Sequence, residues 1–372
     1  MTTRQFNRIL IVRTDRIGDV LLSTPVIKAV RGNYPDAYIA MMVRPYARDI
    51  VDGNPYLDEV LIYDKDEIHK SWFSSLKFSL NLKKKRFDLA IVLHPTNRAH
   101  IITFLAGIPQ RIGYNKKFGF LLTQRLLDEK RFGEKHESEY ALDMIRTLGI
   151  QVKDKSVFMP IKKESEEYIE RLLQDSGVTG QDRLIAVHPG ASCPSKRWPP
   201  ERFAQVADKL IQDYLPTGQA SLPVGKEGKL KVVIISSPEQ VNIGKRVIGV
   251  MSNRPVDLCG KTTVSQLASL LKRCVLFISN DSGPVHIASS VGTPVVALFG
   301  RNEAGLSPIR WGPLGENDVV LHKEVGCIEC LAHNCQKNFA CLKAITVDEV
   351  YQAGLTIFKN SGKINKDISY GA

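Results

Sequence analysis

The 372-residue sequence lacks any apolar run near the roughly 20 residues that cross a bilayer as a helix. It also lacks a signal-type segment, because Met1 is followed within a few residues by the strand-like run Ile9–Val12, with no room for an h-region and cleavage site. No low-complexity tract or short repeat occurs. These absences predict a folded cytoplasmic protein whose membrane contact, if any, is peripheral.

The sequence also has no G-x-G-x-x-G fingerprint after its first strand-like run. Gly18 is the one glycine between that run and the helical pattern expected over Val20–Val30. Because a dinucleotide site needs further glycines for close backbone approach, this absence argues against a dehydrogenase.

The chain does have an ordinary globular composition, with 43% hydrophobic residues, and a net charge of +12. Its length exceeds what one core usually sustains, so two domains are expected. The positive charge indicates an anionic partner, and nucleic acid, phosphorylated small molecules and an acidic membrane surface all fit.

Short β-prone runs alternate with helix-length segments in both halves, which predicts α/β domains with parallel, Rossmann-like sheets. The runs are Ile9–Arg13, Tyr38–Val43, Glu59–Tyr63 and Leu89–Leu93, then Arg183–His188, Leu230–Ser236, Cys274–Ser279 and Pro294–Phe299. The boundary falls between about residues 160 and 182, and we set it at 170, giving domains 1–170 and 171–372. Residues 216–229 are expected to form a solvent loop.

One candidate site is the loop Asn280–Pro284 between a strand and a helix. Unpaired amide groups at a helix N-terminus suit a phosphate, and Ser282 and Gly283 allow close approach. His286 lies in the first helical turn, and Asp281 can accept hydrogen bonds from sugar hydroxyls. The alternative, that Asp281 or Ser282 simply caps the helix, is equally consistent with the loop.

A second candidate is the Gly/Pro-rich segment His188–Phe203, which follows the first strand of the second domain. Lys196 and Arg197 can neutralise a diphosphate, and Ser192 can donate a hydrogen bond. Alternatively, Trp198 anchors the loop and both cations lie in solvent.

A third candidate is Asp19, in a strand-to-helix loop of the first domain. A carboxylate there can take the proton from an attacking hydroxyl. The competing interpretation is a favourable charge at a helix N-terminus.

Four of the seven cysteines fall within fifteen residues, in the pattern C-x2-C-x4-C-x5-C. These are Cys327, Cys330, Cys335 and Cys341. The spacing is tighter than in most structural zinc sites, so ordinary thiols are the default and zinc the minor alternative.

Taken together and in order, three motifs resemble glycosyltransferase family 9, the lipopolysaccharide heptosyltransferases. The motifs are Arg13–Pro25 (RTDRIGDVLLSTP), Pro189–Ser192 with Lys196–Pro199 (PGAS and KRWP), and Ser279–Ala288 through Pro294–Gly300 (SNDSGPVHIA and PVVALFG). The cysteine cluster also resembles one found in several members.

The resemblance implies a GT-B fold of two Rossmann-like domains, with the acceptor bound mainly by domain 1–170 and the nucleotide sugar mainly by domain 171–372. The C-terminal helix is a candidate for packing back on the first domain. The implied reaction is inverting transfer of a heptose from ADP-heptose to the lipopolysaccharide core, without a cofactor, on an acidic glycolipid at the cytoplasmic face of the inner membrane.

Individual roles also follow from the resemblance. Asp19 matches the proposed general base and Lys196 the lysine that contacts the diphosphate. Ser282 and Gly283 match the phosphate-binding loop. The remaining matches are Asp281 and His286, near the donor sugar, and Glu239, which holds the ribose.

Two alternatives stay open. One is a GT-B transferase or epimerase for a different nucleotide sugar. The other is a nucleic-acid-binding protein, which predicts a basic stripe with interleaved aromatic residues. Because basic runs such as Lys83–Arg86 are short and scattered, no nucleic-acid partner is expected.

Overall fold

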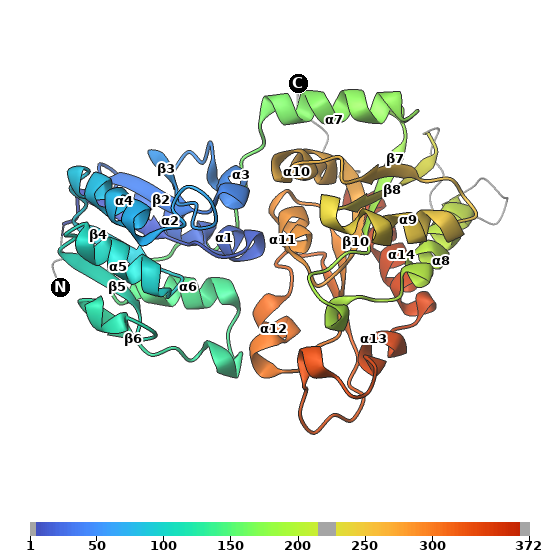
Figure 1. The fold of residues 1–372 in the computed structure, drawn as a ribbon. Helices are drawn as coiled ribbons and strands as arrows, with labels where there is room; N and C mark the ends of the chain where they lie inside the picture. The colour runs from blue at the N-terminus through green and yellow to red at the C-terminus, as the bar shows by residue number, and fades with distance from the viewer. Residues whose placement is uncertain (1–4, 215–227, 365–372) are drawn as a thin grey trace. The chain divides into compact units, whose positions relative to one another are not determined.

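The computed structural model describes residues 5–214 and 228–364. The chain divides into two compact units, residues 1–160 and 161–372, which are described separately (Figure 1). The division at residue 170 expected from sequence falls inside helix α7 (Lys163–Asp175), which packs on α10 (Val264–Lys272) of the second unit. Most of the solvent loop expected over 216–229 lies outside the described residues.

The first unit is built on a six-stranded parallel sheet in the order β3-β2-β1-β4-β5-β6. Its strands are β1 (Arg8–Val12), β2 (Tyr38–Val43), β3 (Glu59–Ile62), β4 (Leu89–Val92), β5 (Gln110–Tyr114) and β6 (Gln124–Leu126). Its helices are α1 (Ile17–Leu21), α2 (Thr24–Asn33), α3 (Arg48–Val51), α4 (Trp72–Lys84), α5 (Asn97–Leu105) and α6 (Glu137–Arg146), with 3-10 turns η1 (Pro45–Ala47), η2 (Gly119–Leu121) and η3 (Lys130–Phe132).

The second unit repeats this plan, with a parallel sheet in the order β12-β11-β10-β7-β8-β9. Its strands are β7 (Arg183–His188), β8 (Leu230–Ser236), β9 (Val256–Cys259), β10 (Cys274–Asn280), β11 (Val295–Phe299) and β12 (Val319–His322). Besides α7 and α10, its helices are α8 (Pro200–Tyr214), α9 (Val241–Val250), α11 (Gly283–Ser290), α12 (Pro308–Trp311), α13 (Ala340–Ala344) and α14 (Val347–Ile364). Its 3-10 turns are η4 (Pro194–Lys196), η5 (Pro238–Gln240), η6 (Ala304–Leu306) and η7 (Ala332–Asn334).

Both orders are those of a doubly wound Rossmann sheet, and the expectation of two such domains is confirmed. The central strands are apolar because helices cover both faces of a parallel sheet. In β1, the residues from Ile9 to Val12 are completely buried.

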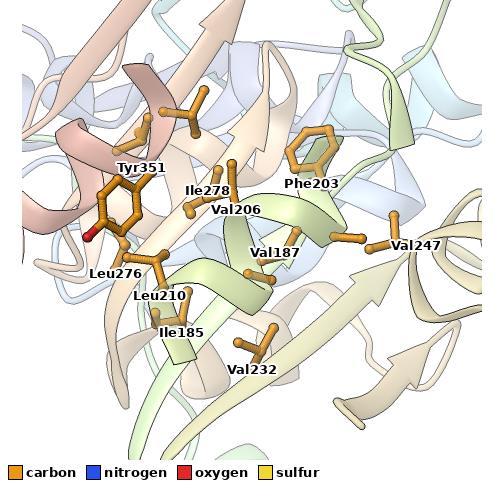
Figure 2. Packing of buried hydrophobic residues seen from close by; sticks show 14 of the residues in the cluster. Ile185, Val187, Phe203, Val206, Leu210, Val232, Val247, Leu276, Ile278 and Tyr351 are labelled. Carbon is orange, nitrogen blue, oxygen red and sulfur yellow. The ribbon is translucent and has the colours of Figure 1, made fainter. Parts of the chain in front are cut away.

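Helix α8 illustrates how the second core forms. Phe203, Val206 and Leu210 recur at helical spacing and are buried against Ile185 and Val187 of β7 (Figure 2).

Helix α14 packs beside α8 and on β10, through buried side chains that include Tyr351 and Phe358. The described residues of this C-terminal helix therefore contribute to the core of the second unit. The reason is its apolar stripe, which completes the core around α8.

The helix expected over Val20–Val30 is interrupted. Helix α1 ends at Leu21, and α2 starts afresh at Thr24 with Pro25 in its first turn. Proline is tolerated there because its missing N–H has no helical partner in the first turn. The short α1 thereby carries Asp19 directly after the β1 loop.

In each sheet, successive strands are added first toward one edge and then toward the other. The switch point lies between β1 and β4 in the first unit and between β7 and β10 in the second. Ligands of open α/β sheets bind outside the carboxyl ends of strands at such points. No helix among the described residues is both long and apolar enough to cross a membrane.

Candidate active site

A buried arginine organises the switch point of the first unit. Arg13 follows β1 and is 1% exposed. Its guanidinium donates to Asp15 and Asp19 at 2.8 Å each and to Glu137, at the start of α6, at 3.0 Å. Lys130 also contacts the Glu137 carboxylate, at 2.6 Å. One arginine thus holds three carboxylates, which come from two segments far apart in the sequence.

This crowding changes the acidity of Asp19. Burial and the nearby Asp15 carboxylate raise the pKa of Asp19 to about 6, against the lowering effect of Arg13. Burial also raises the pKa of Asp15. At neutral pH Asp19 is therefore ionised, yet it is a stronger base than an ordinary aspartate.

His94, which follows β4, lies on the other side of the same switch point. Its Nδ1 atom lies 4.0 Å from Asp15 Oδ2. Burial, with Arg13 nearby, lowers the pKa of His94 to about 4, so the imidazole is neutral at physiological pH.

The second unit has the opposite arrangement at its switch point, where one carboxylate lies between two cations. Oδ2 of Asp281 lies 2.9 Å from Lys196 Nζ and 2.9 Å from Arg301 Nη2. The Arg301 side chain is 7% exposed, and its Nε atom is buried without a hydrogen-bond partner among the described residues. Burial lowers the pKa of Lys196, and Arg301 adds to this while Asp281 opposes it. The cluster therefore keeps one positive charge in excess.

The start of α11 lies directly after Asp281. Ser282 occupies the N-cap position, but its side chain makes no capping hydrogen bond. Its hydroxyl instead contacts Ser279 Oγ at 3.1 Å and His188 Nδ1 at 3.3 Å. Neither Ser282 nor Asp281, which is engaged with the cations, caps the helix in this structure, so the capping interpretation fails here. Backbone N–H groups without a side-chain cap can bind an anion.

The remaining predicted residues lie at the same carboxyl edge of the second sheet but do not all meet. Ser192 is exposed after β7, and its hydroxyl contacts only Cys193 Sγ, at 3.9 Å, among the described residues. Glu239 is exposed in η5 after β8. His286 is buried in α11, and Gly283 is the first residue of that helix. The structure thus joins Lys196 and Asp281 in one cluster with Arg301 and places Ser282 in a separate network with Ser279 and His188. Ser192 and Glu239 lie exposed at the edge of the site.

The sequence profile described as Glycosyltransferase family 9 (heptosyltransferase) matches residues 75–340. The chain belongs to glycosyltransferase family 9. Membership of a transferase family decides against the epimerase alternative. The match includes the Lys196 and Asp281 segments of the second unit.

Relatives of known name cover most of the chain. Lipopolysaccharide heptosyltransferase 2 of Salmonella typhimurium is 26% identical over 310 residues, 81% of this chain and 85% of the relative. Lipopolysaccharide heptosyltransferase 3 of Escherichia coli is 28% identical over 312 residues, 81% and 84% of the two chains.

Solved structures agree with the family. A glycosyl transferase family 9 protein from Veillonella parvula superposes with a TM-score of 0.84 at 26% identity, covering 96% of this chain and all of that one. The structure of E. coli ADP-heptose lps heptosyltransferase II gives 0.75 at 22% identity, covering 95% and 99%. The predicted GT-B fold is confirmed.

The sequence analysis did not identify Arg301, or the contacts of Arg13 with Asp15 and Glu137. Arg301 follows β11, which lies two strands from β7 and the Lys196 loop. The sequence signal that could have identified it is a cation shortly after a buried strand. Gly300 precedes it, and a Cβ there would lie 2.6 Å from Leu342 Cγ, so the close packing requires glycine. Glu137 is distant in sequence from Arg13, and no local pattern announces their contact.

The cysteine cluster lines a cavity of about 320 Å³ beside Arg301. All four thiols are free, and within residues 5–214 and 228–364 no three His, Cys, Asp or Glu side chains are placed to hold a metal ion. Cys330 and Cys335 accept backbone hydrogen bonds from Asn302 and Phe339, and Cys341 donates to the Gly300 carbonyl at 2.6 Å. The zinc hypothesis for Cys327, Cys330, Cys335 and Cys341 gains no support from this arrangement.

Proposed function

We propose that this protein is an inverting heptosyltransferase that transfers a heptose from ADP-heptose to the core of lipopolysaccharide. Family membership and the names of its relatives support this reaction. The observation that carries the proposal is the Lys196–Asp281–Arg301 cluster, a buried cationic group beside an uncapped helix N-terminus. Such a group suits the diphosphate of a nucleotide sugar.

We assign donor binding to the second unit. Lys196, with Ser282 and the backbone at Gly283, would stabilise the negative charge that develops on the leaving diphosphate. These groups supply the positive charge that a divalent cation supplies elsewhere, so we propose a reaction without a metal cofactor. Ser192 would add a further hydrogen bond to the phosphates.

The rest of the donor would contact residues around this cluster. Glu239 is exposed at the end of β8, where its carboxylate can accept hydrogen bonds from ribose hydroxyls. Asp281 and His286 would face the heptose. Asp281 would accept hydrogen bonds from the sugar hydroxyls once the diphosphate has replaced it as the partner of Lys196 and Arg301.

We assign acceptor activation to Asp19 of the first unit. The acceptor oxygen would bond to the anomeric carbon on the face opposite the diphosphate, its proton would pass to Asp19, and ADP would leave with the electrons of the broken bond. The raised pKa of Asp19 favours this proton transfer, and Arg13 holds the carboxylate in place. The acceptor would be an acidic glycolipid at the cytoplasmic face of the inner membrane.

The proposal is tested by thermal shift with ADP-, UDP- and GDP-sugars on the wild type and Lys196→Ala. ADP-heptose should raise the melting temperature of the wild type, and UDP- and GDP-sugars should raise it less. Lys196→Ala should lose most of the ADP-heptose shift, because a charge-assisted hydrogen bond contributes about 1.5–3 kcal/mol.

Lys163→Ala, an exposed lysine of α7 in the same unit, is the matched control and should retain the full shift. The donor assignment is wrong if no nucleotide sugar stabilises the wild type, or if Lys196→Ala responds as the wild type does.

A further inference from the structure

The positive charge of this chain is concentrated in one stretch of the first unit. Residues 68–127 contain eleven Lys and Arg residues and one acidic residue, Asp88, so they carry ten of the twelve net positive charges. The Asp88 carboxylate is already engaged with the backbone N–H groups of Asn7 and Arg8. Almost all of the charge that indicates an anionic partner therefore comes from β4, β5 and the helices and turns around them.

Helix α4, within this stretch, buries two serines and leaves several of its large apolar residues exposed, while Leu82 and Phe78 of the same helix pack in the core. Ser75 and Ser79 are buried, and the Ser75 hydroxyl lies 2.8 Å from the Tyr63 hydroxyl. Phe73 is 86% exposed, Trp72 56% and Leu80 51%. A surface helix normally buries its large apolar residues, so the exposed apolar stripe of α4 contributes little to the core of the unit.

The stripe continues onto neighbouring elements. Helix α5 packs beside α4, and η2 packs on α5, as the adjacent positions of α4 and α5 in Figure 1 also show. Phe104 on α5 is 47% exposed and Phe120 on η2 is 61% exposed. We call this surface, formed by Trp72, Phe73, Leu76, Leu80, Phe104 and Phe120, the α4–α5 face. Exposed apolar patches of this kind mark interaction sites.

Cations accompany the stripe. Lys77, Lys83 and Lys84 are exposed on α4 and make no ion pair within the described part of the chain. The guanidinium of Arg98 lies 5.1 Å from the centre of the Trp72 ring. Aromatic and aliphatic side chains interleaved with lysines, on a helix without acidic residues, are typical of helices that lie in a lipid–water interface.

We infer that the α4–α5 face docks on a bilayer of anionic lipids, with its apolar side chains in the interface and its lysines on the headgroups. Charge complementarity favours anionic lipid as the partner, because each lysine close to an anionic bilayer contributes about 1 kcal/mol of binding free energy. A second copy of the chain would place two strongly cationic faces together, since a two-fold interface pairs like with like. Single-stranded nucleic acid would stack on aromatic rings, whereas Leu76 and Leu80 offer none.

This inference deepens the proposed function, and rests on it in that a lipid-borne acceptor is presented at such a surface. Vesicle binding needs neither donor nor acceptor, so the docking surface and the proposed function can be tested separately. Loss of transfer with intact vesicle binding would contradict the proposed function alone. Normal transfer to a soluble acceptor without vesicle binding would contradict the docking surface alone.

The experiment is co-sedimentation of the full chain with vesicles of phosphatidylglycerol and phosphatidylethanolamine, compared with phosphatidylcholine. Binding should occur on the anionic vesicles and weaken at high salt. W72S/F73S and K83E/K84E should each weaken partitioning on the order of tenfold. The matched controls in the second unit are I309S, at a residue that is 66% exposed, and K163E/K343E.

Fluorescence supplies a second measurement that does not depend on sedimentation. Of the three tryptophans, Trp72 is exposed, Trp198 is fully buried and Trp311 is partly buried in α12 of the second unit. Brominated lipids should therefore quench the Trp72 emission and spare that of the other two. Quenching should disappear in W72F, and circular dichroism should show that every variant is folded.

Equal binding to neutral vesicles, or retained binding in both double variants of the α4–α5 face, would overturn the inference. So would lipid-free dimerisation that W72S/F73S abolishes, or tighter binding to single-stranded RNA than to anionic vesicles.

Discussion

The two units share one strand order but place opposite charges at the switch point. In the first unit, three carboxylates surround Arg13; in the second, two cations surround Asp281. The sheet decides where polar side chains gather, because the carboxyl ends of its central strands meet there. The residues that follow each strand decide what that place can bind. One topology therefore holds a cluster of carboxylates in one unit and a cluster of cations in the other.

Burial acts on both clusters in the same sense, since it favours the neutral form of every group. It raises the pKa of Asp19 and lowers that of Lys196. For Asp19 the result is a better proton acceptor, and for Lys196 it is a cation that gains from a new anionic neighbour.

The largest expected effect on this contrast between the two units is that of Asp19→Asn. If the first-unit cluster provides the base, transfer from ADP-heptose should fall by about 10²–10⁴-fold, because the amide cannot take the acceptor proton. ADP-heptose binding, measured by calorimetry, should be unchanged. Asp36→Asn, an exposed aspartate of the same unit, should retain full turnover. Near-normal turnover by Asp19→Asn would remove Asp19 as the base.

A smaller effect is expected from Arg301→Ala in the second unit. If Arg301 contacts the diphosphate with Lys196, ADP affinity should fall about 10- to 100-fold, the equivalent of a charged hydrogen bond. Adenosine, which has no phosphate, should bind equally to both proteins. A parallel loss for adenosine would instead indicate a distorted site. Arg310→Ala, on α12 of the same unit, is the control and should bind ADP as the wild type does.

The smallest effect is a shift in pH dependence. Below a pH of about 6 Asp19 becomes protonated, so kcat/KM should fall about tenfold per pH unit there and level off above it. Asp15→Asn removes a charge that raises the pKa of Asp19, so it should move this acidic limb to lower pH. A limb that stays in place in Asp15→Asn would show that another group titrates.

The apolar central strands could be predicted from sequence because burial on both faces leaves continuous hydrophobic runs. Strands β5, β6, β9 and β12 were not predicted. β5 contains Arg111 and Gly113 among its five residues, and β6, β9 and β12 are short strands at sheet edges. Edge strands carry mixed side chains, so their pattern resembles that of a loop.

The candidate sites divide in the same way. Asp19, Lys196 and Asp281 could be predicted from local sequence, since each lies after a recognisable strand. The partners Glu137 and Arg301 reach the sites from other segments, and only the folded sheet brings them there. The competition between a helix cap and a phosphate site at Ser282 likewise depended on a hydroxyl rotamer, which no sequence pattern specifies.

Lys196 and Arg301 share a single oxygen of Asp281, and this has a consequence for how a donor enters. The Asp281 carboxylate lies where the proposed donor would place a phosphate, so donor binding would exchange one anion for another. Such an exchange would leave neither cation without an anionic neighbour. It would also free the Asp281 carboxylate to accept hydrogen bonds from the sugar, so that phosphate binding and heptose binding would be coupled.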